Sequence, residues 1–153
     1  MPETDPPAVI NFYSTAGEYG CLSNFSRHAV FLKGKRWPTT EHYFQAQKFA
    51  GEPDEEEIRT AGKALLAAGM GRDRKRPLRR DWEGVKDQVM LDALRAKFTQ
   101  HDDLKAVLLG TGEAKLVEHT ANDAYWGDGG DGSGKNRLGQ LLMRLRAELR
   151  TAE

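Results

Sequence analysis

Cysteine is nearly absent from this chain of 153 residues, because Cys21 is the only one. An intrachain disulfide and a cysteine-based zinc cluster are therefore excluded, and the four histidines show no metal-ligand spacing. Neither sign of charge is in excess: 23 basic and 23 acidic residues cancel, so the net charge does not indicate a nucleic-acid binder. No apolar run is long enough to span a bilayer, and Met1–Asp5 has no signal-peptide features. We expect a cytoplasmic protein without a metal or other cofactor.

The length and the balance of 39% hydrophobic and 30% charged residues predict one folded domain rather than a disordered chain. We expect an α+β fold: a single compact, mainly helical domain with a small β component, over residues 9–150, after a flexible N-terminus of residues 1–8. The predicted strands cover residues 9–13, 28–32, 35–37 and 115–119. The predicted helices cover residues 39–51, 54–68, 82–98, 102–109 and 138–149. In the second helix, Ile58, Ala61, Leu65 and Ala68 are expected to face inward.

The first predicted helix carries three different polar functions in one line. Glu41, Gln45 and Lys48 stand at i, i+4 and i+7, so they share a helix face. Thr39 or Thr40 is the predicted N-cap, and His42, which points off this face, is predicted to be buried. A carboxylate near an amine can perform acid–base and imine chemistry. The alternative is an ion pair on a solvent-exposed helix face.

Charge is uneven along the chain although it cancels overall. Six basic residues crowd a connector between the second and third predicted helices: Arg72, Arg74, Lys75, Arg76, Arg79 and Arg80. This run is either a solvated loop or a surface that contacts phosphates.

A second candidate site is the segment from Glu118 to Asn136, where five glycines fall within eight residues. Glycines let backbone amides approach a ligand closely, so the segment is either a flexible connector or a phosphate or ribose site. It matches neither a P-loop nor an EF-hand. Trp82 and Trp126 are each either core residues or stacking walls for a base, and Asn24 with Phe25 forms a further aromatic–amide cluster.

Together these residues resemble the YbiA-like, or NADAR, superfamily. The similarity runs in order along the chain over roughly 135 residues. In the first half of the chain it is carried by Asn11-Phe12-Tyr13, Leu22-Ser23-Asn24-Phe25, Trp37-Pro38-Thr39-Thr40-Glu41-His42-Tyr43-Phe44-Gln45-Ala46-Gln47-Lys48-Phe49 and Asp81-Trp82. In the second half it is carried by Met90, Lys97-Phe98, Leu116-Val117-Glu118, Trp126-Gly127, Gly132-x-Gly134-x-Asn136-x-Leu138-Gly139 and Leu142-Met143-x-Leu145-Arg146.

The resemblance implies a compact α+β enzyme, an N-glycosidase acting where an exocyclic amine nitrogen is bonded to the ribose C1. One implied substrate is ADP-ribose attached to guanine in DNA, which implies DNA contact through the basic run and a functional link to a DNA-guanine ADP-ribosyltransferase toxin. The alternatives are a phosphoribosylamino-pyrimidine intermediate of riboflavin synthesis and a non-catalytic ADP-ribose or NAD sensor. Glu41 and Lys48 are the implied catalytic residues. The implied substrate-binding residues are Asn24, Phe25, Gln45, Trp82, Glu118, Trp126, Gly127, Asp128, Gly132, Gly134 and Asn136.

Overall fold

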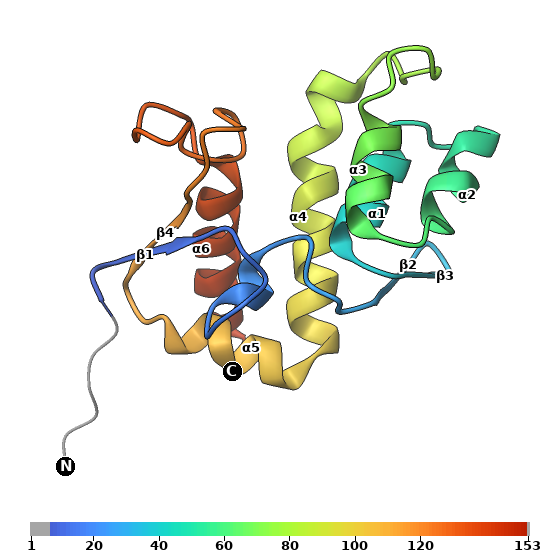
Figure 1. Cartoon of the computed structure of the whole chain (residues 1–153). Coiled ribbons are helices and arrows are strands. Elements are labelled where there is room, and N and C mark those ends of the chain that lie inside the picture. Colours follow the sequence, from blue (N-terminus) through green and yellow to red (C-terminus); the bar gives the residue numbers. More distant parts are fainter. Residues whose placement is uncertain (1–6, 153) are drawn as a thin grey trace. The chain divides into compact units, whose positions relative to one another are not determined.

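The computed structural model describes residues 7–152, which form six α-helices, a 3₁₀ turn and four short strands (Figure 1). The fold is α+β and mainly helical, as predicted. Two compact units divide the described chain: residues 24–100 form one, and the segments before residue 24 and after residue 100 form the other. The elements are β1 (Val9–Phe12), η1 (Gly20–Leu22), β2 (Val30–Leu32), β3 (Lys35–Trp37), α1 (Thr40–Gln47), α2 (Pro53–Arg59), α3 (Ala64–Gly71), α4 (Trp82–Gln100), α5 (Asp102–Gly110), β4 (Lys115–Glu118) and α6 (Arg137–Thr151).

In the unit of residues 24–100, α1 is the central element, with α2, α3 and α4 packed around it (Figure 1). All eight residues of α1 are buried, polar ones included. Thr39 is the N-cap, one of the two threonines predicted for this role, and its hydroxyl accepts a hydrogen bond from the backbone N–H of His42. The predicted end near Gly51 is four residues too late, since α1 ends at Gln47. The core beside it contains Val30, Trp37, Tyr43, Ala46, Phe49, Ile58, Ala67, Ala93 and Ala96.

The second predicted helix is wrong as one element, because α2 ends at Arg59 and α3 begins at Ala64. The hydroxyl of Thr60 bonds back to the carbonyl of Glu56, and Gly62 follows in the connection, a combination that ends a helix. The break changes the helical phase. Ile58 and Ala68 are buried as predicted, but Leu65 is 69% exposed.

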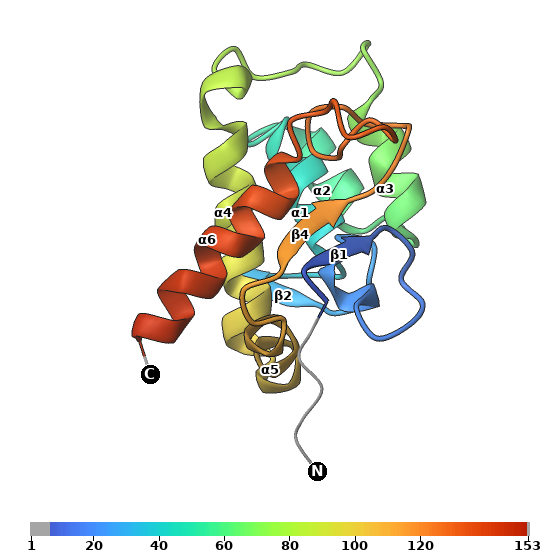
Figure 2. The same cartoon turned by 90° about the vertical axis from the view of Figure 1, so that its left-hand side faces the viewer.

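In the other unit, β1 and β4 form a parallel pair that the sequence reading did not predict (Figure 2). Helix α6 packs against β4 and α5 packs against α6. Residues 1–6 of the predicted flexible segment lie outside the described residues. The carbonyl of Ala8 accepts a hydrogen bond from the backbone N–H of Lys115, so this residue is tied to β4.

Asn136 joins α6 to β4. It lies in the left-handed region with φ of 53°, which asparagine tolerates better than most residues. Its amide oxygen accepts from the backbone N–H of Glu118 at 2.9 Å, and its amide nitrogen donates to the carbonyl of Leu116 at 2.9 Å. Gly139 permits this close approach, because a Cβ there would lie 2.0 Å from the carbonyl oxygen of Leu116.

We predict that Asn136→Ala lowers the free energy of unfolding by about 2–3 kcal/mol, because a buried and a partly buried backbone group lose their partner and alanine disfavours the left-handed region. Urea unfolding followed by circular dichroism measures this. Asn122→Ala, at an exposed asparagine of the same unit, is the control and should change stability by less than about 0.5 kcal/mol. Equal effects of the two substitutions would contradict this account of Asn136.

Candidate active site

The polar line of α1 is buried in the structure. Glu41 is 6% exposed and Gln45 is 4% exposed, and Lys48 is half-buried at the C-terminal end of the helix. The alternative of a solvent-exposed ion pair is therefore wrong for this face. Polar groups in such positions need hydrogen-bond partners or a ligand, since burying them alone is costly.

The side-chain amide of Gln45 forms a hydrogen bond through its nitrogen but not through its oxygen. Its amide nitrogen donates to a carboxylate oxygen of Glu41 at 3.2 Å. Its amide oxygen Oε1 is buried and accepts no hydrogen bond from the described residues. A buried acceptor without a donor is unusual in a folded protein, and such groups occur where a ligand or water supplies the missing donor.

Lys48 donates a hydrogen bond from Nζ to the carbonyl oxygen of Gly71 at 3.2 Å. The same nitrogen lies 5.8 Å from the ring centre of Phe44 and 5.9 Å from that of Trp82. Burial lowers the pKa of Lys48 below that of an ordinary lysine. The charge of Glu41 opposes this pKa shift, and the charge of Arg72 adds to it. The net effect increases the neutral amine, which is the nucleophilic form.

A pocket of about 580 Å³ opens beside Lys48. Trp82 forms part of its wall and is itself only 6% exposed, with its ring centre 5.1 Å from that of Phe44. The volume is within the range of small-molecule sites. The lining residues are Lys48, Phe49, Gly71, Arg72, Asp73, Arg74, Arg76, Leu78 and Trp82.

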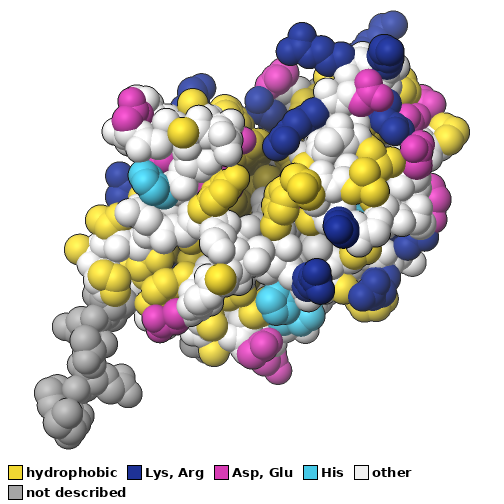
Figure 3. All heavy atoms as spheres, in the orientation of Figure 1, with side chains coloured by type: hydrophobic (Ala, Val, Ile, Leu, Met, Phe, Trp, Pro, Cys, Tyr) yellow, Lys and Arg dark blue, Asp and Glu magenta, His cyan; other side chains and the backbone are white. Residues whose placement is uncertain are grey.

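The basic run forms the connection between α3 and α4, where Lys and Arg side chains gather in Figure 3. The structure divides its six cations into two groups. Arg76 pairs with Asp54 at 2.8 Å and with Glu57 at 3.0 Å, and Arg79 pairs with Asp81 at 2.7 Å. The other four are exposed and form no ion pair with any residue in 7–152: Arg72, Arg74, Lys75 and Arg80. These four are the cations available to an anionic ligand.

Arg79 also positions this connection on α1. Its backbone N–H donates to the carbonyl of Lys48 at 2.9 Å, and its guanidinium donates to the carbonyl of Gln47 at 3.4 Å. These bonds satisfy carbonyls at the C-terminal end of α1, which have no partner within the helix. Arg79 therefore holds the basic connection beside Lys48.

Asn24 has a structural role at the start of α1. Its side-chain oxygen accepts from the hydroxyl of Thr40 at 2.9 Å, and its backbone carbonyl accepts from the N–H of Glu41 at 3.2 Å. Its side-chain nitrogen donates to the sulfur of Met90 at 3.3 Å. Phe25, next to it, is half-buried. The binding role predicted for these two residues stays a prediction.

His42 lies in the core, as predicted. Its exposed fraction is 1%, and its ring bonds to the hydroxyl of Thr39 at 2.8 Å and to the carbonyl of Ala61 at 2.9 Å. Burial lowers the pKa of His42, so the ring is neutral near pH 7.

The predicted residues of the glycine-rich segment belong to the other unit, where they organise their own loop. The carboxylate of Asp128 accepts from His119 at 2.7 Å, from the backbone N–H of Thr120 at 3.0 Å and from that of Gly130 at 2.8 Å. The His119 hydrogen bond is the main cause that lowers the pKa of Asp128 to about 2. This carboxylate therefore orders the loop in its charged form.

Two of the predicted glycines are required by close packing. A Cβ on Gly127 would lie 2.7 Å from the methyl group of Thr120, and one on Gly134 would lie 2.6 Å from the carbonyl oxygen of Gly127. Gly132 has φ of +87° and open space around it. Their role in ligand binding stays a prediction.

Two further predicted residues lie in this unit. Glu118 ends β4, and its carbonyl accepts from the backbone N–H of Asp128 at 2.9 Å. Trp126 is half-buried, with its ring 4.8 Å from that of Tyr125 in an edge-to-face arrangement. Their ligand-binding roles also stay predictions.

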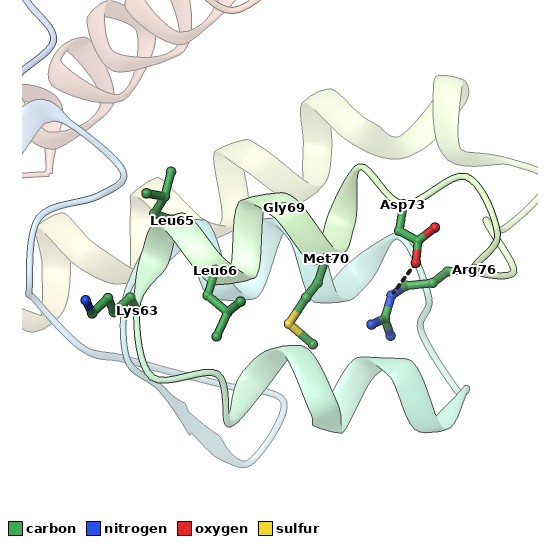
Figure 4. Close-up of a pocket in the computed structure, with 7 residues that line it drawn as sticks. All are labelled: Lys63, Leu65, Leu66, Gly69, Met70, Asp73 and Arg76. Atoms are coloured by element: carbon green, nitrogen blue, oxygen red, sulfur yellow. Dashed lines mark ion pairs between the residues drawn. The ribbon is translucent and has the colours of Figure 1, made fainter.

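A second groove, of about 760 Å³, runs along α3 (Figure 4). Leu66 and Met70 point toward α2, and Leu65 points to the other side. Asp73 and Arg76 form an ion pair at one end. The groove has no nucleophile or acid–base pair comparable to Glu41 and Lys48, so it is not the candidate for chemistry. Its residues are Lys63, Leu65, Leu66, Gly69, Met70, Asp73 and Arg76.

Gly71 contacts two of the predicted site residues and was not predicted. Its carbonyl binds Lys48, and the side chain of Gln45 lies against its Cα. The sequence places Gly71 in a connector next to the basic run, and its contact with Gln45 follows only from the packing of α3 on α1. No cluster of three or more metal-ligating side chains occurs within residues 7–152. None of the helices in this range is both long and apolar enough to cross a membrane.

A known protein, N-glycosidase YbiA, is similar to this chain in both sequence and structure. N-glycosidase YbiA of Escherichia coli strain K12 is 63% identical over 141 residues, covering 92% of this chain and 88% of that protein. The NMR structure of E. coli YbiA superimposes with a TM-score of 0.89 at 60% identity, covering 97% of this chain and 89% of that one.

Two more distant relatives carry different names. N-glycosidase Npun_R5314 of Nostoc punctiforme is 45% identical, with 93% of each chain covered. Riboflavin biosynthesis protein VVA0006 of Vibrio vulnificus is 41% identical over 92% of this chain and 38% of that protein. The family model described as NADAR domain matches residues 11–150, a span that includes all of one unit, most of the other and every candidate site residue. The chain therefore belongs to the NADAR domain family.

Proposed function

We propose that this protein is an N-glycosidase that cleaves the bond between a ribose C1 and an exocyclic amine nitrogen, and that its substrate is ADP-ribose attached to guanine in DNA. The observation that carries the proposal is an amine of lowered pKa, Lys48, beside a pocket and on the same helix as the buried carboxylate of Glu41. The names of the relatives from E. coli and N. punctiforme support the reaction class.

The substrate class suits an amine nucleophile. When C1 of a ribose bears an exocyclic nitrogen, the ribose ring can open, and C1 then forms an imine with that nitrogen. The neutral amine of Lys48 adds to C1, the original amine leaves after it gains a proton, and C1 is then bonded to Lys48 as a new imine. Water adds to this imine and releases the sugar and the lysine. Glu41 transfers the protons in both steps.

Residues on the pocket lining, and Gln45 next to Gly71 of that lining, supply binding. The open amide oxygen of Gln45 is an acceptor for a sugar hydroxyl. Trp82 offers an apolar wall, and the exposed Arg72 and Arg74 carry positive charge on the pocket lining, where phosphates would be attracted. With DNA as the substrate, the enzyme would reverse the action of a guanine-modifying ADP-ribosyltransferase, which is an antitoxin role.

A second candidate substrate is a phosphoribosylamino-pyrimidine intermediate of riboflavin synthesis. The name of the V. vulnificus relative favours it, and the bond to be cleaved is of the same kind. A non-catalytic ADP-ribose sensor is a third candidate. It would need the pocket and the arginines but gains nothing from a lysine of lowered pKa beside a buried carboxylate.

The first prediction concerns cleavage. An oligonucleotide carrying ADP-ribose on guanine should release free ADP-ribose with the wild-type protein, and Glu41→Gln and Lys48→Ala should each lower the rate by about 100-fold or more, the range attributed to one acid–base or nucleophilic group. Chromatography of released ADP-ribose measures the rate. Arg36→Ala, on the exposed part of β3, is the control and should keep wild-type activity.

The outcomes separate the candidates. Cleavage of the pyrimidine riboside phosphate but not of the oligonucleotide would assign the riboflavin intermediate. Binding of ADP-ribose without cleavage of either substrate would assign the sensor.

The second prediction concerns the covalent intermediate and its pH dependence. Borohydride added during turnover should reduce the imine and attach the sugar to Lys48, which mass spectrometry of peptides would locate. Because the pKa of Lys48 is lowered, the neutral amine forms at lower pH than in an ordinary lysine, so trapping should increase with pH and reach half its maximum below the ordinary lysine pKa. Full activity of Lys48→Arg with no adduct in the wild type would exclude the imine mechanism.

The third prediction concerns DNA contact. Arg74→Ala/Lys75→Ala should raise the KM for the modified oligonucleotide with little change in kcat, because these two exposed cations, Arg74 on the pocket lining and Lys75 next to it, would contact phosphates and not the bond that is cleaved. The slope of log affinity against log salt should decrease in magnitude by about 1.5, as expected for two lost phosphate contacts. Fluorescence anisotropy measures the slope. A slope equal to that of Arg36→Ala would exclude this surface from DNA binding.

A further inference from the structure

Gly71 places two side chains of the proposed site at once. It is the last residue of α3 and is buried. Its carbonyl oxygen accepts the hydrogen bond from Lys48 Nζ at 3.2 Å. An ideal Cβ built on it would lie 2.0 Å from Oε1 of Gln45, 2.6 Å from Cδ and 2.8 Å from Cβ of that side chain. The side chain of Gln45 therefore occupies the space that any other residue at position 71 would fill.

The need for glycine here comes from packing and not from backbone conformation. Gly71 is not among the glycines with positive φ, so an alanine could adopt its backbone angles. An alanine would displace the side chain of Gln45, because real Cβ contacts below 3.0 Å essentially do not occur. The displaced group would be the amide that donates to Glu41 and has an open oxygen.

We propose that Gly71 is a positioning residue of the active site. Its bare Cα holds the Gln45 amide in the orientation that bonds Glu41 and leaves Oε1 open, and its carbonyl holds the Lys48 amine beside the pocket. The consequence for catalysis rests on the proposed function, but the consequence for Lys48 and Gln45 does not. A methyl group at position 71 should therefore alter the environment of Lys48 even without substrate.

The matched control lies two residues earlier on the same helix. Gly69 is exposed, and a Cβ there meets nothing within 4 Å. Gly69→Ala and Gly71→Ala make the same chemical change in one helix, and both replace a glycine by a better helix former. A difference between the two variants therefore reports the contact at position 71.

The experiment has a readout that needs no substrate. The lysines are methylated with ¹³C-formaldehyde under reducing conditions, the Lys48 signal is assigned with Lys48→Arg, and its titration is followed by NMR. In Gly71→Ala the pKa of Lys48 should rise toward that of an ordinary lysine, because the amine leaves its buried place; in Gly69→Ala it should stay at the wild-type value. Titration of Lys48 in Gly71→Ala at the wild-type pKa would overturn the proposal.

The second readout is turnover of the ADP-ribosylated oligonucleotide. Gly71→Ala should lower kcat by on the order of 100-fold, the loss that a misplacement of about 1 Å can cause, with a much smaller change in KM, and Gly69→Ala should keep the wild-type kcat. If the wild type cleaves no substrate, the proposed function fails, and the titration still decides the role of Gly71.

A third variant keeps the proposal testable if Gly71→Ala does not fold. Gly71→Ala/Gln45→Ala removes the two closest contacts of the added methyl group, with Oε1 and Cδ of Gln45, and leaves only the contact with Cβ at 2.8 Å. The melting temperature of the double variant should lie above that of Gly71→Ala, and the pKa of its Lys48 should stay below that of an ordinary lysine, because the carbonyl of residue 71 remains in place to accept the hydrogen bond from Lys48. A double variant that melts no higher than Gly71→Ala, or whose Lys48 titrates as an ordinary lysine, would overturn the proposal.

Discussion

A helix buried on every side must find partners for its polar side chains inside the protein, and α1 is such a helix. Most of its polar groups meet this requirement through the elements around it. Thr40 bonds to Asn24, His42 bonds to Thr39 and to the carbonyl of Ala61, and Gln47 bonds to Glu55 and Lys33. These bonds connect α1 to the chain before it, to the turn between the antiparallel strands β2 and β3, and to α2. The packing of residues 24–100 depends on them.

The exception on this helix lies on its polar line. Gln45 gives its amide nitrogen to Glu41 but keeps a buried oxygen without a donor, and Lys48 is held where burial lowers its pKa. Both features disfavour the folded state, so they need an explanation other than stability. Lys48 lines a pocket of about 580 Å³, as does Gly71, which contacts both side chains. A substrate that donates to Gln45 and reacts with Lys48 supplies such an explanation. The groups that cost stability are the groups that the proposed reaction uses.

How far the sequence predicts this protein depends on the range of the interactions. The helical spacing of Glu41, Gln45 and Lys48 is local, and it predicts that the three lie close together. In the structure Gln45 bonds to Glu41, and Gln45 and Lys48 both contact Gly71. The break between α2 and α3 depends on Thr60 and Gly62, weak signals in a segment whose apolar spacing continues through it, so Leu65 was wrongly placed inside. The parallel pairing of β1 with β4 and the contact of Gly71 with Gln45 join distant segments, and no periodic pattern in one sequence encodes them.

The charge of the basic run could also be predicted only in part from the sequence. Six cations in nine residues predict a positive surface, yet two of these cations form ion pairs in the structure. Arg76 pairs with acids of α2, and Arg79 pairs with Asp81 just before α4. Arg76 joins the connection to α2, and Arg79 joins it to the end of α1. The paired arginines hold the connection in place so that Arg72 and Arg74 stand on the lining of the pocket. The run thus serves two purposes: two of its cations shape the rim, and the exposed ones leave it positive for an anionic substrate.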